Sequence, residues 1–349
     1  MENPSVVFVE AGRVEVLNRP LPVPAAGEVL IRTTCSLIST GTELMLLSGK
    51  ARRDSVWAEL TEFPFQPGYS NVGEVVEIGA GVESWWLGRR VGTHTAHAAY
   101  VTCAVSALRP LPETVRAEDA TFGTLSEVVM NGLRRGQLTW GESVAVVGLG
   151  LLGQLCVRLC ALAGAQMVFG IELSPRRLQW LPEGASFYGL LGAAGEFRET
   201  IMERNKGRLL DVVFELTSDP EAIPGQLTLL RPQGRFVILS SPRGATLFDF
   251  HDLCNRQSFT IIGAHGFSHP PVETLNNPWT GRRHGELFLD LLAAGKLSVR
   301  ELISHRLPYQ HAPEAYELLA SRRAEAMGVV LDWQTRPSTR AMSQEQPTG

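Results

Sequence analysis

The sequence contains few cysteines, and their spacing matches no pattern that would use them. Five cysteines occur in 349 residues, without a C-x-x-C pair: Cys35, Cys103, Cys156, Cys160 and Cys254. This spacing excludes a disulfide framework of the secreted type, so we expect reduced thiols. Cys156 and Cys160 lie four residues apart, which places both on one face of a helix, and we expect them to face a core.

Positive charge is also scarce. The 32 Lys and Arg residues are outnumbered by 36 Asp and Glu residues, the formal net charge is −4, and the chain has no long Lys/Arg block. A protein that binds nucleic acid over an extended surface needs such a block to neutralise phosphates, so nucleic acid is excluded as a partner. The composition, 44% hydrophobic and 19% charged, is typical of a globular protein that buries a large core.

Segments that would direct the chain to a membrane are missing as well. The start, MENPSVVFVEAGRVEV, lacks the basic opening, apolar stretch and small-residue cleavage site of a signal peptide, and it predicts strands instead. The most apolar region, residues 144–171, is broken by Gln154, Arg158 and Gln166 and cannot cross a bilayer as one apolar helix. We therefore expect a cytoplasmic protein without a membrane partner.

The 349 residues exceed the length at which a single core stops growing, so we expect two domains. Two different patterns of secondary structure along the chain agree with this. From residue 6 to about 115, short β-rich runs alternate with Gly/Pro turns, as in a small barrel or sandwich. From about 120 to 266, apolar strands such as SVAVVG, DVVFEL and GRFVILS alternate with helical segments, which is typical of a parallel sheet. Helices and strands follow in turn, and the polar, proline-broken end predicts a frayed tail.

A glycine motif lies near the start of the region of alternating strands and helices, residues 120–266. Gly148, Gly150 and Gly153 form G-x-G-x-x-G directly after the strand at residues 144–147 and open a helical pattern. The first glycine permits a tight turn, the second lets backbone amides approach a pyrophosphate, and the third allows close packing of the helix. The motif, with Leu151 and Leu152 inside it, therefore predicts a Rossmann site for a dinucleotide.

Residues at the ends of the following strands extend this site. Glu172 ends the next strand, where a carboxylate holds the ribose hydroxyls of NAD and repels the 2′-phosphate of NADP. We therefore expect NAD, with NADP as the alternative because Arg177 follows closely enough to receive a phosphate. Thr217 and Ser240, at the ends of two further strands, are expected to lie near the cofactor.

Taken together, the chain resembles the medium-chain dehydrogenase/reductase superfamily, which includes zinc alcohol dehydrogenases and zinc-free quinone reductases. The resemblance covers nearly the whole chain and rests on AAGEVLIRT, PGYSNVGEVVEIGAGV, GRRVGTHTAHAAYV, GLRRGQLTWGESVAVVGLGLLG and LISHRLPYQHAPEAYELL. It implies an α/β protein with a β-rich, GroES-like catalytic domain from residues 1–120 and 267–335. A doubly wound Rossmann domain for NAD is implied at 121–266, followed by a flexible tail at 336–349, and the family expectation is a homodimer.

The zinc positions of this family carry other residues here. In zinc-dependent members the equivalent of PGYSNVGEV has His-Glu in place of Tyr69 and Ser70, and that histidine binds the catalytic zinc. Ser39 takes the position of a ligand cysteine, and Thr124 takes that of a third cysteine or carboxylate. Catalytic zinc needs three His, Cys or carboxylate ligands, and admitting Cys35 would supply only one. The four-cysteine structural zinc lobe is also missing, so the resemblance implies a member without zinc.

Without zinc, a side chain must manage the proton that accompanies hydride transfer at the nicotinamide. Tyr69 is our first candidate, because it takes the position of the metal ligand, with Thr42 as a hydroxyl relay and Glu43 to orient it. A tyrosine can serve when a cation or relay draws its pKa, about 10 in water, toward neutrality. The alternative is a tyrosine that only fills the space of the lost metal.

Three histidines and a serine are further candidates. His94 and His97 flank the run THTAHAAYV, and we expect His97 rather than His94 to enter the cleft as an acid or base. As residues three apart on a strand they would face opposite sides, so one should enter the cleft at most. His94 and Ser39 are kept as candidates for substrate contact, and His265 is expected beside the nicotinamide amide.

A long irregular segment, HPPVETLNNPWTGRRHGE, precedes the amphipathic helix near the end of the chain. Such loops usually carry function. We interpret this one as a lid whose Trp279 and Arg282 contact the substrate, with a dimer or solvent loop as the alternative.

These features predict a zinc-independent, NAD-preferring oxidoreductase that interconverts an alcohol and a ketone on a sugar- or cyclitol-like small molecule. One alternative is the NAD(P)H-dependent reduction of a C=C bond conjugated to a carbonyl, which needs no carbonyl-polarising metal. Another follows from the STGTE run at residues 39–43, which resembles bacteriochlorophyllide dehydrogenases and implies a hydroxyethyl tetrapyrrole as substrate. The last is a nicotinamide-binding homologue that has lost its activity.

Overall fold

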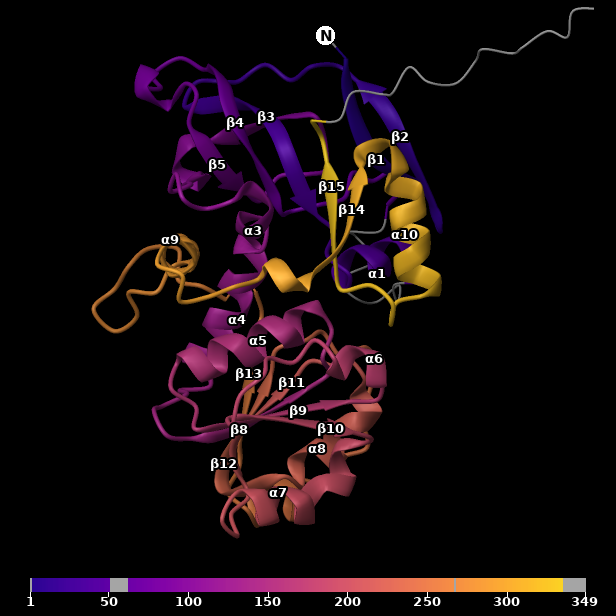
Figure 1. Cartoon of the computed structure of the whole chain (residues 1–349), viewed down its shortest axis with the longest axis vertical. Coiled ribbons are helices and arrows are strands. Elements are labelled where there is room, and N and C mark those ends of the chain that lie inside the picture. The colour runs from indigo at the N-terminus through magenta and orange to yellow at the C-terminus, as the bar shows by residue number, and fades with distance from the viewer. Residues whose placement is uncertain (1, 51–61, 267, 335–349) are drawn as a thin grey trace, which may run out of the picture.

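The computed structural model describes residues 2–50, 62–266 and 268–334, which form two lobes joined by helices (Figure 1). The lower lobe in Figure 1 holds a parallel sheet. The upper lobe contains strands from both ends of the chain, and helix α4 (Gly123–Arg135) lies between the lobes.

The lower lobe is a doubly wound sheet of six parallel strands. Their order is β10-β9-β8-β11-β12-β13, with bounds β8 (Ser143–Val147), β9 (Met167–Glu172), β10 (Phe187–Leu191), β11 (Leu210–Glu215), β12 (Leu230–Ile238) and β13 (Thr260–Gly263). The order reverses at β8 and β11, and ligands of such sheets bind at the carboxyl ends of the strands beside this point. The predicted Rossmann fold is confirmed.

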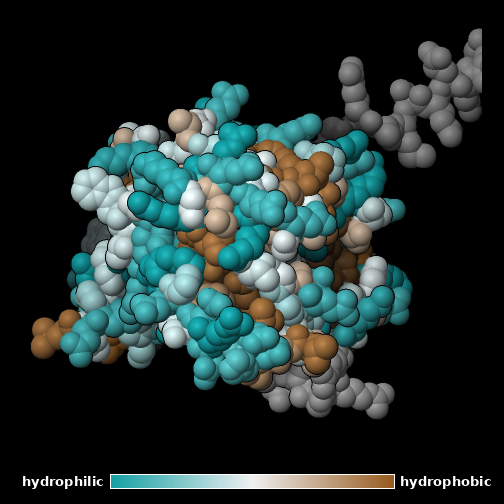
Figure 2. All heavy atoms as spheres, turned by 90° about the horizontal axis from the view of Figure 1, so that it is seen from below, coloured by the Kyte–Doolittle hydropathy of each residue, from teal (hydrophilic) through white to brown (hydrophobic). Residues whose placement is uncertain are grey.

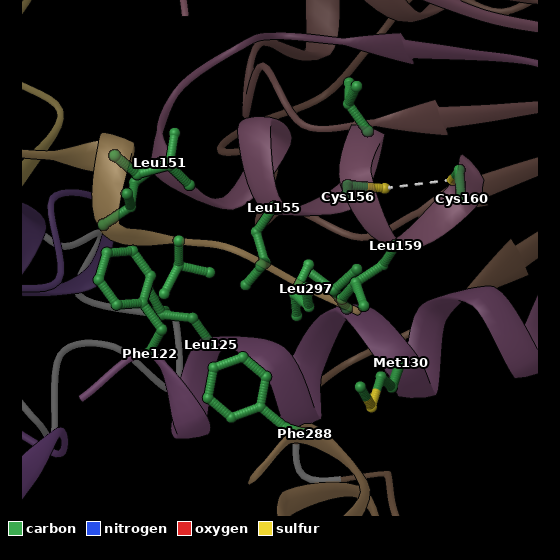
Figure 3. Packing of buried hydrophobic residues seen from close by; sticks show 14 of the residues in the cluster. Phe122, Leu125, Met130, Leu151, Leu155, Cys156, Leu159, Cys160, Phe288 and Leu297 are labelled. Carbon is green, nitrogen blue, oxygen red and sulfur yellow. Dashed lines mark hydrogen bonds between the residues drawn. The ribbon is translucent and has the colours of Figure 1, made fainter. Parts of the chain in front are cut away.

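Helices cover both faces of this sheet: α5 (Leu151–Leu162), α6 (Pro175–Leu178), α7 (Arg198–Arg204) and α8 (Ile223–Leu227). Leu155 and Leu159 of α5 point toward α4 (Figure 3), and full burial of one leucine contributes about 1.5–3 kcal/mol. Cys156 and Cys160 are fully buried on the same helix with their Sγ atoms 3.9 Å apart, so the prediction that they face a core is confirmed.

The upper lobe is built around a mostly antiparallel sheet of order β14-β15-β3-β4-β5-β7, with β6 also pairing to β3 and a separate hairpin of β1 and β2. The strands are β1 (Asn3–Glu10), β2 (Arg13–Arg19), β3 (Glu28–Leu37), β4 (Asn71–Ile78), β5 (Arg90–Thr93), β6 (Tyr100–Ala104), β7 (Arg109–Pro110), β14 (Ile303–Pro308) and β15 (Gly328–Asp332). Because β15 pairs with β3, the chain returns to complete its first lobe.

The helices that the structure describes beside the upper lobe are α1 (Thr42–Ser48), α3 (Ala117–Ala120), α9 (Gly281–Ala293) and α10 (Ala312–Ser321). Helix α9 begins earlier than the sequence indicated, because the Thr280 side chain caps it by accepting a hydrogen bond from the Arg283 amide at 3.2 Å. Arg282 therefore belongs to the first turn of a helix and not to the preceding loop.

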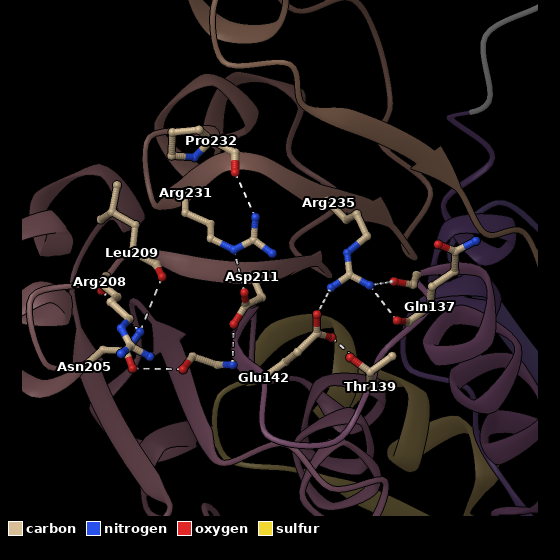
Figure 4. Close-up of polar contacts among 12 residues, drawn as sticks. Gln137, Thr139, Glu142, Asn205, Arg208, Leu209, Asp211, Arg231, Pro232 and Arg235 are labelled. Carbon is tan, nitrogen blue, oxygen red and sulfur yellow. Dashed lines mark hydrogen bonds and ion pairs between the residues drawn. The ribbon is translucent and has the colours of Figure 1, made fainter.

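Polar contacts join the amino-terminal ends of the parallel strands, at the end of the sheet opposite the glycine motif (Figure 4). Arg235 of β12 donates to the carbonyl oxygen of Gly136 at 2.9 Å and forms an ion pair with Glu142. On β11, Asp211 accepts from the Ser143 amide at 2.9 Å and from Arg231 Nε at 2.6 Å. These contacts fix the starts of the strands. They do not involve the carboxyl ends, where ligands of such sheets bind.

Hydrophobic residues on the face shown in Figure 2 lie in patches between hydrophilic ones. Among the helices that the structure describes, none combines the length and apolarity needed to cross a membrane.

Candidate functional site

The glycine motif forms the turn between β8 and α5, and the backbone explains two of its three glycines. Gly148 has φ +95°, and a Cβ there would lie 2.8 Å from the Leu216 carbonyl group. A Cβ on Gly153 would lie 2.0 Å from the Gly148 oxygen. Gly150 differs, because a Cβ there would meet nothing within 4 Å. Its missing side chain leaves open space in front of the start of α5, and this arrangement fits a dinucleotide pyrophosphate.

Glu172 at the end of β9 organises this turn. One of its oxygens accepts from the Leu149 amide at 2.8 Å, and the other accepts from the amides of Leu173 and Ser174 at 2.8 and 3.1 Å. Arg177 lies 3.5 Å from the same carboxylate. The acid that we expected at the ribose is therefore also a structural link between the glycine turn and the next loop.

Glu215 at the end of β11 has a similar role that the sequence did not reveal. Its fully buried carboxylate accepts from the Thr217 amide at 2.7 Å, from the Thr217 hydroxyl at 2.5 Å and from the Ser218 amide at 3.0 Å. Ser240 also donates to Glu215, so Thr217 and Ser240 meet beside the carboxyl ends of β11 and β12. An acidic residue inside the apolar run DVVFEL was the only signal of this role.

Three arginines from separate segments approach one another beside Glu172. Desolvation lowers the pKa of Arg323, and the nearby cations of Arg177 and Arg243 lower it further. Arg177 Nε is buried and has no hydrogen-bond partner among the described residues. The sequence indicated Arg177 but not the two arginines that come from distant parts of the chain.

A group of hydroxyls occupies the start of β4 and the end of β3. The Ser39 and Tyr69 hydroxyl oxygens are 2.5 Å apart, and the Tyr69 hydroxyl donates to Thr42 Oγ1 at 3.4 Å. Thr124, at the start of α4, donates to the Tyr69 carbonyl oxygen at 2.7 Å. The turn that presents Tyr69 needs Gly68, which has φ +113° and whose Cβ would lie 2.7 Å from the His97 amide nitrogen.

The surroundings of Tyr69 act on its pKa in a direction opposite to the one we expected. Burial raises the pKa of the phenol above its ordinary value of 10.0, and hydrogen bonds from Ser39 and Thr42 offset only part of that effect. The nearest charge that acts on it, the Glu43 carboxylate, raises it further. The phenol is therefore protonated at neutral pH and suits a proton donor rather than a base.

Glu43 is the centre of a buried network behind the hydroxyl group. Only 1% of the residue is exposed, and its carboxylate accepts from the Ser39 amide at 2.7 Å and from His97 Nε2 at 3.1 Å. Tyr316 of α10 donates a further hydrogen bond to it. The sequence placed Glu43 near Tyr69 but did not indicate Tyr316, which lies far along the chain.

The hydrogen bonds around His97 place a proton on Nε2. The Glu43 carboxylate accepts, so His97 Nε2 donates to it at 3.1 Å. His97 Nδ1 lies 2.8 Å from the Ser36 hydroxyl, which also accepts from Trp333 Nε1 at 2.9 Å. His97 is fully buried and acts on the site through Glu43.

The positions of the two neighbouring histidines differ from our expectation. We expected His97 in the cleft, but it is His94 whose side chain is 44% exposed, with Nε2 3.2 Å from Glu127. Arg109 lies 3.4 Å from the same carboxylate. The reason is local, since residues 94–99 form an irregular bend between β5 and β6, and the alternation of a strand does not apply to them.

The expected lid residues lie away from Tyr69. The Arg134 guanidinium stacks on Trp279, with its central carbon 3.2 Å from the ring centroid, and Arg282 pairs with Glu286 at 2.8 Å. Arg134 follows Thr124 by ten residues on α4, a distance of about 15 Å along a helix axis. His265, the candidate expected beside the nicotinamide amide, accepts a hydrogen bond from the Asn131 side chain through its backbone carbonyl oxygen at 3.2 Å.

Comparisons with known proteins agree with this architecture. The family model for an alcohol dehydrogenase GroES-like domain matches residues 25–146, and the model for a zinc-binding dehydrogenase matches residues 152–277. The L-threonine 3-dehydrogenase of Pyrococcus horikoshii is 25% identical over 343 residues, covering 87% of this chain and 91% of the relative. The sorbitol dehydrogenase of Gallus gallus is 24% identical over 365 residues, covering 95% and 96%.

A solved structure has the same fold. It is a short chain alcohol dehydrogenase of Escherichia coli CFT073 in complex with NADH, with a TM-score of 0.79 and 18% identity, covering 95% of this chain and 99% of that one. The chain belongs to the medium-chain dehydrogenase/reductase superfamily, of the zinc alcohol dehydrogenase-like type. It is an NAD(P)-dependent oxidoreductase.

The zinc that this family usually binds does not fit the residues at its position. Ser39, Tyr69 and Thr124 offer three hydroxyls, and burial raises the pKa of the Tyr69 phenol and of the Cys35 thiol, which keeps both neutral. Within residues 2–50, 62–266 and 268–334, no three His, Cys, Asp or Glu side chains gather in a set that would hold a metal ion. Zinc prefers imidazole, thiolate and carboxylate ligands.

Replacing Glu43 with glutamine tests the buried network. The amide group would bring N–H donors toward the donors of Ser39, His97 and Tyr316, so we expect the free energy of unfolding in urea to fall by about 2 kcal/mol. Glu74→Gln is the control, because Glu74 forms an exposed ion pair with Arg32, and we expect a change within about 1 kcal/mol. Equal effects in the two variants would contradict this assignment.

Proposed function

We propose that the chain is a zinc-independent, NAD-preferring enzyme that interconverts an alcohol and a ketone on a polyhydroxylated small molecule. The observation that carries this proposal is the set of hydroxyls of Ser39, Tyr69 and Thr124 at the family's zinc position. The sorbitol dehydrogenase among the relatives supports a polyol-like substrate.

In this proposal Tyr69 handles the proton. A bound nicotinamide supplies the hydride, and the protein must then give a proton to the carbonyl oxygen in the reductive direction. The phenol is protonated at neutral pH, its raised pKa makes it a weaker acid than an exposed tyrosine, and Ser39 and Thr42 are placed to pass a replacement proton to it. Glu43, at the start of α1, accepts a hydrogen bond from the Ser39 amide, and His97 donates to Glu43, so both residues help to position Ser39.

The preference for NAD rests on Glu172, whose carboxylate lies beside the glycine turn where a 2′-phosphate would be repelled. The nearby cations of Arg177, Arg243 and Arg323 favour NADP as the second candidate, because three cations would attract an additional phosphate. Dissociation constants for NADH and NADPH, measured by fluorescence titration, decide between the two.

Metal removal tests the zinc-free part of the proposal. We expect purified protein to hold far less than one zinc per chain by elemental analysis. Dialysis against a chelator should leave NADH oxidation unchanged in a screen of ketoses, inososes and simple ketones, because no step depends on a metal. Zinc at one ion per chain that is required for turnover would overturn the proposal, and a screen without turnover despite NADH binding would favour the inactive homologue.

A homodimer and a cytoplasmic location stay predictions. Strand β13 supports the homodimer, because it is the edge of the parallel sheet and is exposed at three of its four positions. An exposed edge of this kind is able to pair with a second copy. Sedimentation velocity measures the oligomeric state.

A further inference from the structure

A hollow of about 820 Å³ lies at the far end of α4, outside the site described above. Its lining includes leucines from three helices, Leu133 on α4, Leu159 and Leu162 on α5, and Leu291 on α9, and we call these four residues the leucine floor. Leu162 is 41% exposed, so part of its side chain is accessible to a ligand. The volume falls within the range of about 300–1,000 Å³ that small-molecule sites occupy.

Two cations also line the hollow. They are Arg134 and Arg135, which line it together with Trp279. The guanidinium carbons of Arg134 and Arg283 lie 3.2 and 4.2 Å from the centroid of the Trp279 ring. In the part of the chain that the structure describes, none of these three arginines forms an ion pair with a carboxylate. Among the described residues, the arginines at this hollow therefore carry positive charge without a carboxylate partner.

Two histidines hold Arg134 in place. Arg134 Nε donates to His284 Nε2 at 3.0 Å, so the proton of His284 is on Nδ1 and is donated to His269 Nε2 at 3.1 Å. His269 Nδ1 in turn donates to the Gly266 carbonyl oxygen at 2.8 Å. Burial, followed by the neighbouring His269, Arg134 and Arg283, lowers the pKa of His284 to about 3, so His284 is a neutral acceptor at physiological pH.

This chain of hydrogen bonds leaves part of the Arg134 guanidinium for a ligand. Only its Nε atom is bonded to another described residue, and the Nη groups remain as donors on an exposed side chain. Partial desolvation and the adjacent Arg283 lower the pKa of Arg134 to about 10. A carboxylate placed against it would supply a compensating anion and accept two hydrogen bonds in parallel.

We propose that this hollow binds an amphipathic carboxylate, a small molecule whose carboxylate meets Arg134 and Arg135 and whose apolar body lies on the leucines. Charge complementarity selects the anionic head, and the leucine floor selects the apolar body. Neither a sugar nor a cationic amphiphile matches both parts.

The arginines and Leu162 of the hollow lie away from the glycine turn and from Thr124, whereas Asn131, which also lines the hollow, donates to the His265 carbonyl oxygen. Leu162 is the last residue of α5, whose first residue follows Gly150, and Arg134 lies ten residues beyond Thr124 on α4. Both intervals correspond to about 15 Å along a helix axis. Occupation of the hollow should therefore not compete with NADH.

Octanoate is a suitable probe, with acetate to supply the head alone and 1-octanol to supply the tail alone. We expect octanoate to bind the full-length protein saturably in calorimetric titration, at least tenfold more tightly than either partial probe, and with the same affinity when NADH is present. Equal binding of acetate or of 1-octanol would overturn the proposal. Loss of octanoate binding at saturating NADH would overturn it as well. A change of oligomeric state on binding would also contradict it, because it would indicate that a second copy of the chain occupies the hollow.

Two variants with matched controls localise the binding. Arg134→Gln should weaken octanoate binding about tenfold, which is about 1.4 kcal/mol. Arg89→Gln is its control, because Arg89 also stacks on a tryptophan, Trp85, in the other lobe. Leu162→Glu tests the floor by charge repulsion at a partly exposed position that tolerates a polar residue, and it should weaken binding about tenfold as well.

The control for the floor is Leu17→Glu, since Leu17 on β2 is 37% exposed and lies in the other lobe. Both controls should bind octanoate as the unmodified protein does. If Arg134→Gln and Leu162→Glu also bind it unchanged, the hollow is not the site, and the proposal is wrong whatever reaction the enzyme performs.

Discussion

Tyr69→Phe is expected to lower kcat by about 10²-fold to 10⁴-fold in the reductive direction, the usual contribution of a positioned general acid. The variant keeps the ring and removes only the hydroxyl that Ser39 and Thr42 contact. The dissociation constant of NADH should not change, because the glycine turn lies on another strand. Steady-state kinetics combined with fluorescence titration of NADH measures the two quantities separately.

The pH profile adds a readout that a purely structural role would not move. Burial raises the pKa of the Tyr69 phenol above 10.0, so the protonated donor persists through neutral pH, and its contribution to reduction is lost only as the pH rises through the raised value. Tyr188→Phe is the control, since Tyr188 lies on β10 and stacks on Phe169. An unchanged kcat for Tyr69→Phe would favour the alternative that Tyr69 only fills the space of a lost metal.

Local patterns predicted the parts of the molecule that local chemistry determines. The parallel sheet followed from apolar strands that alternate with helical segments, and the glycine turn followed from the spacing of Gly148, Gly150 and Gly153 after a strand. The meeting of Ser39 and Tyr69 followed from the family resemblance, because a family's ligand positions converge whatever residues fill them.

Local sequence patterns could not predict contacts between segments that lie far apart in the chain. Tyr316 reaches Glu43 across 273 residues of sequence, and nothing in the helix that carries it indicates this bond. His97 was misplaced because an irregular bend has no period from which a side-chain direction can be read.

The glycine turn permits a test that separates the cofactor site from the fold. Gly150→Ala adds a Cβ that meets no protein atom within 4 Å, at a backbone φ of −68° that alanine adopts freely. We expect its thermal stability to be unchanged. The methyl group would, however, occupy the space through which a pyrophosphate reaches the start of α5. The dissociation constant of NADH should therefore rise by about 10-fold to 100-fold, which is about 1.4–2.7 kcal/mol.

Gly153→Ala is the contrasting variant, because its Cβ would lie 2.0 Å from the Gly148 oxygen and the turn would have to move. It should lose both thermal stability and NADH affinity, whereas Gly225→Ala on α8, where the nearest atom would be 3.5 Å away, should keep both. Calorimetric unfolding and NADH titration on the three variants give the comparison. If Gly150→Ala binds NADH as tightly as the unmodified protein, the pyrophosphate does not approach this turn, and the cofactor must be bound elsewhere on the sheet.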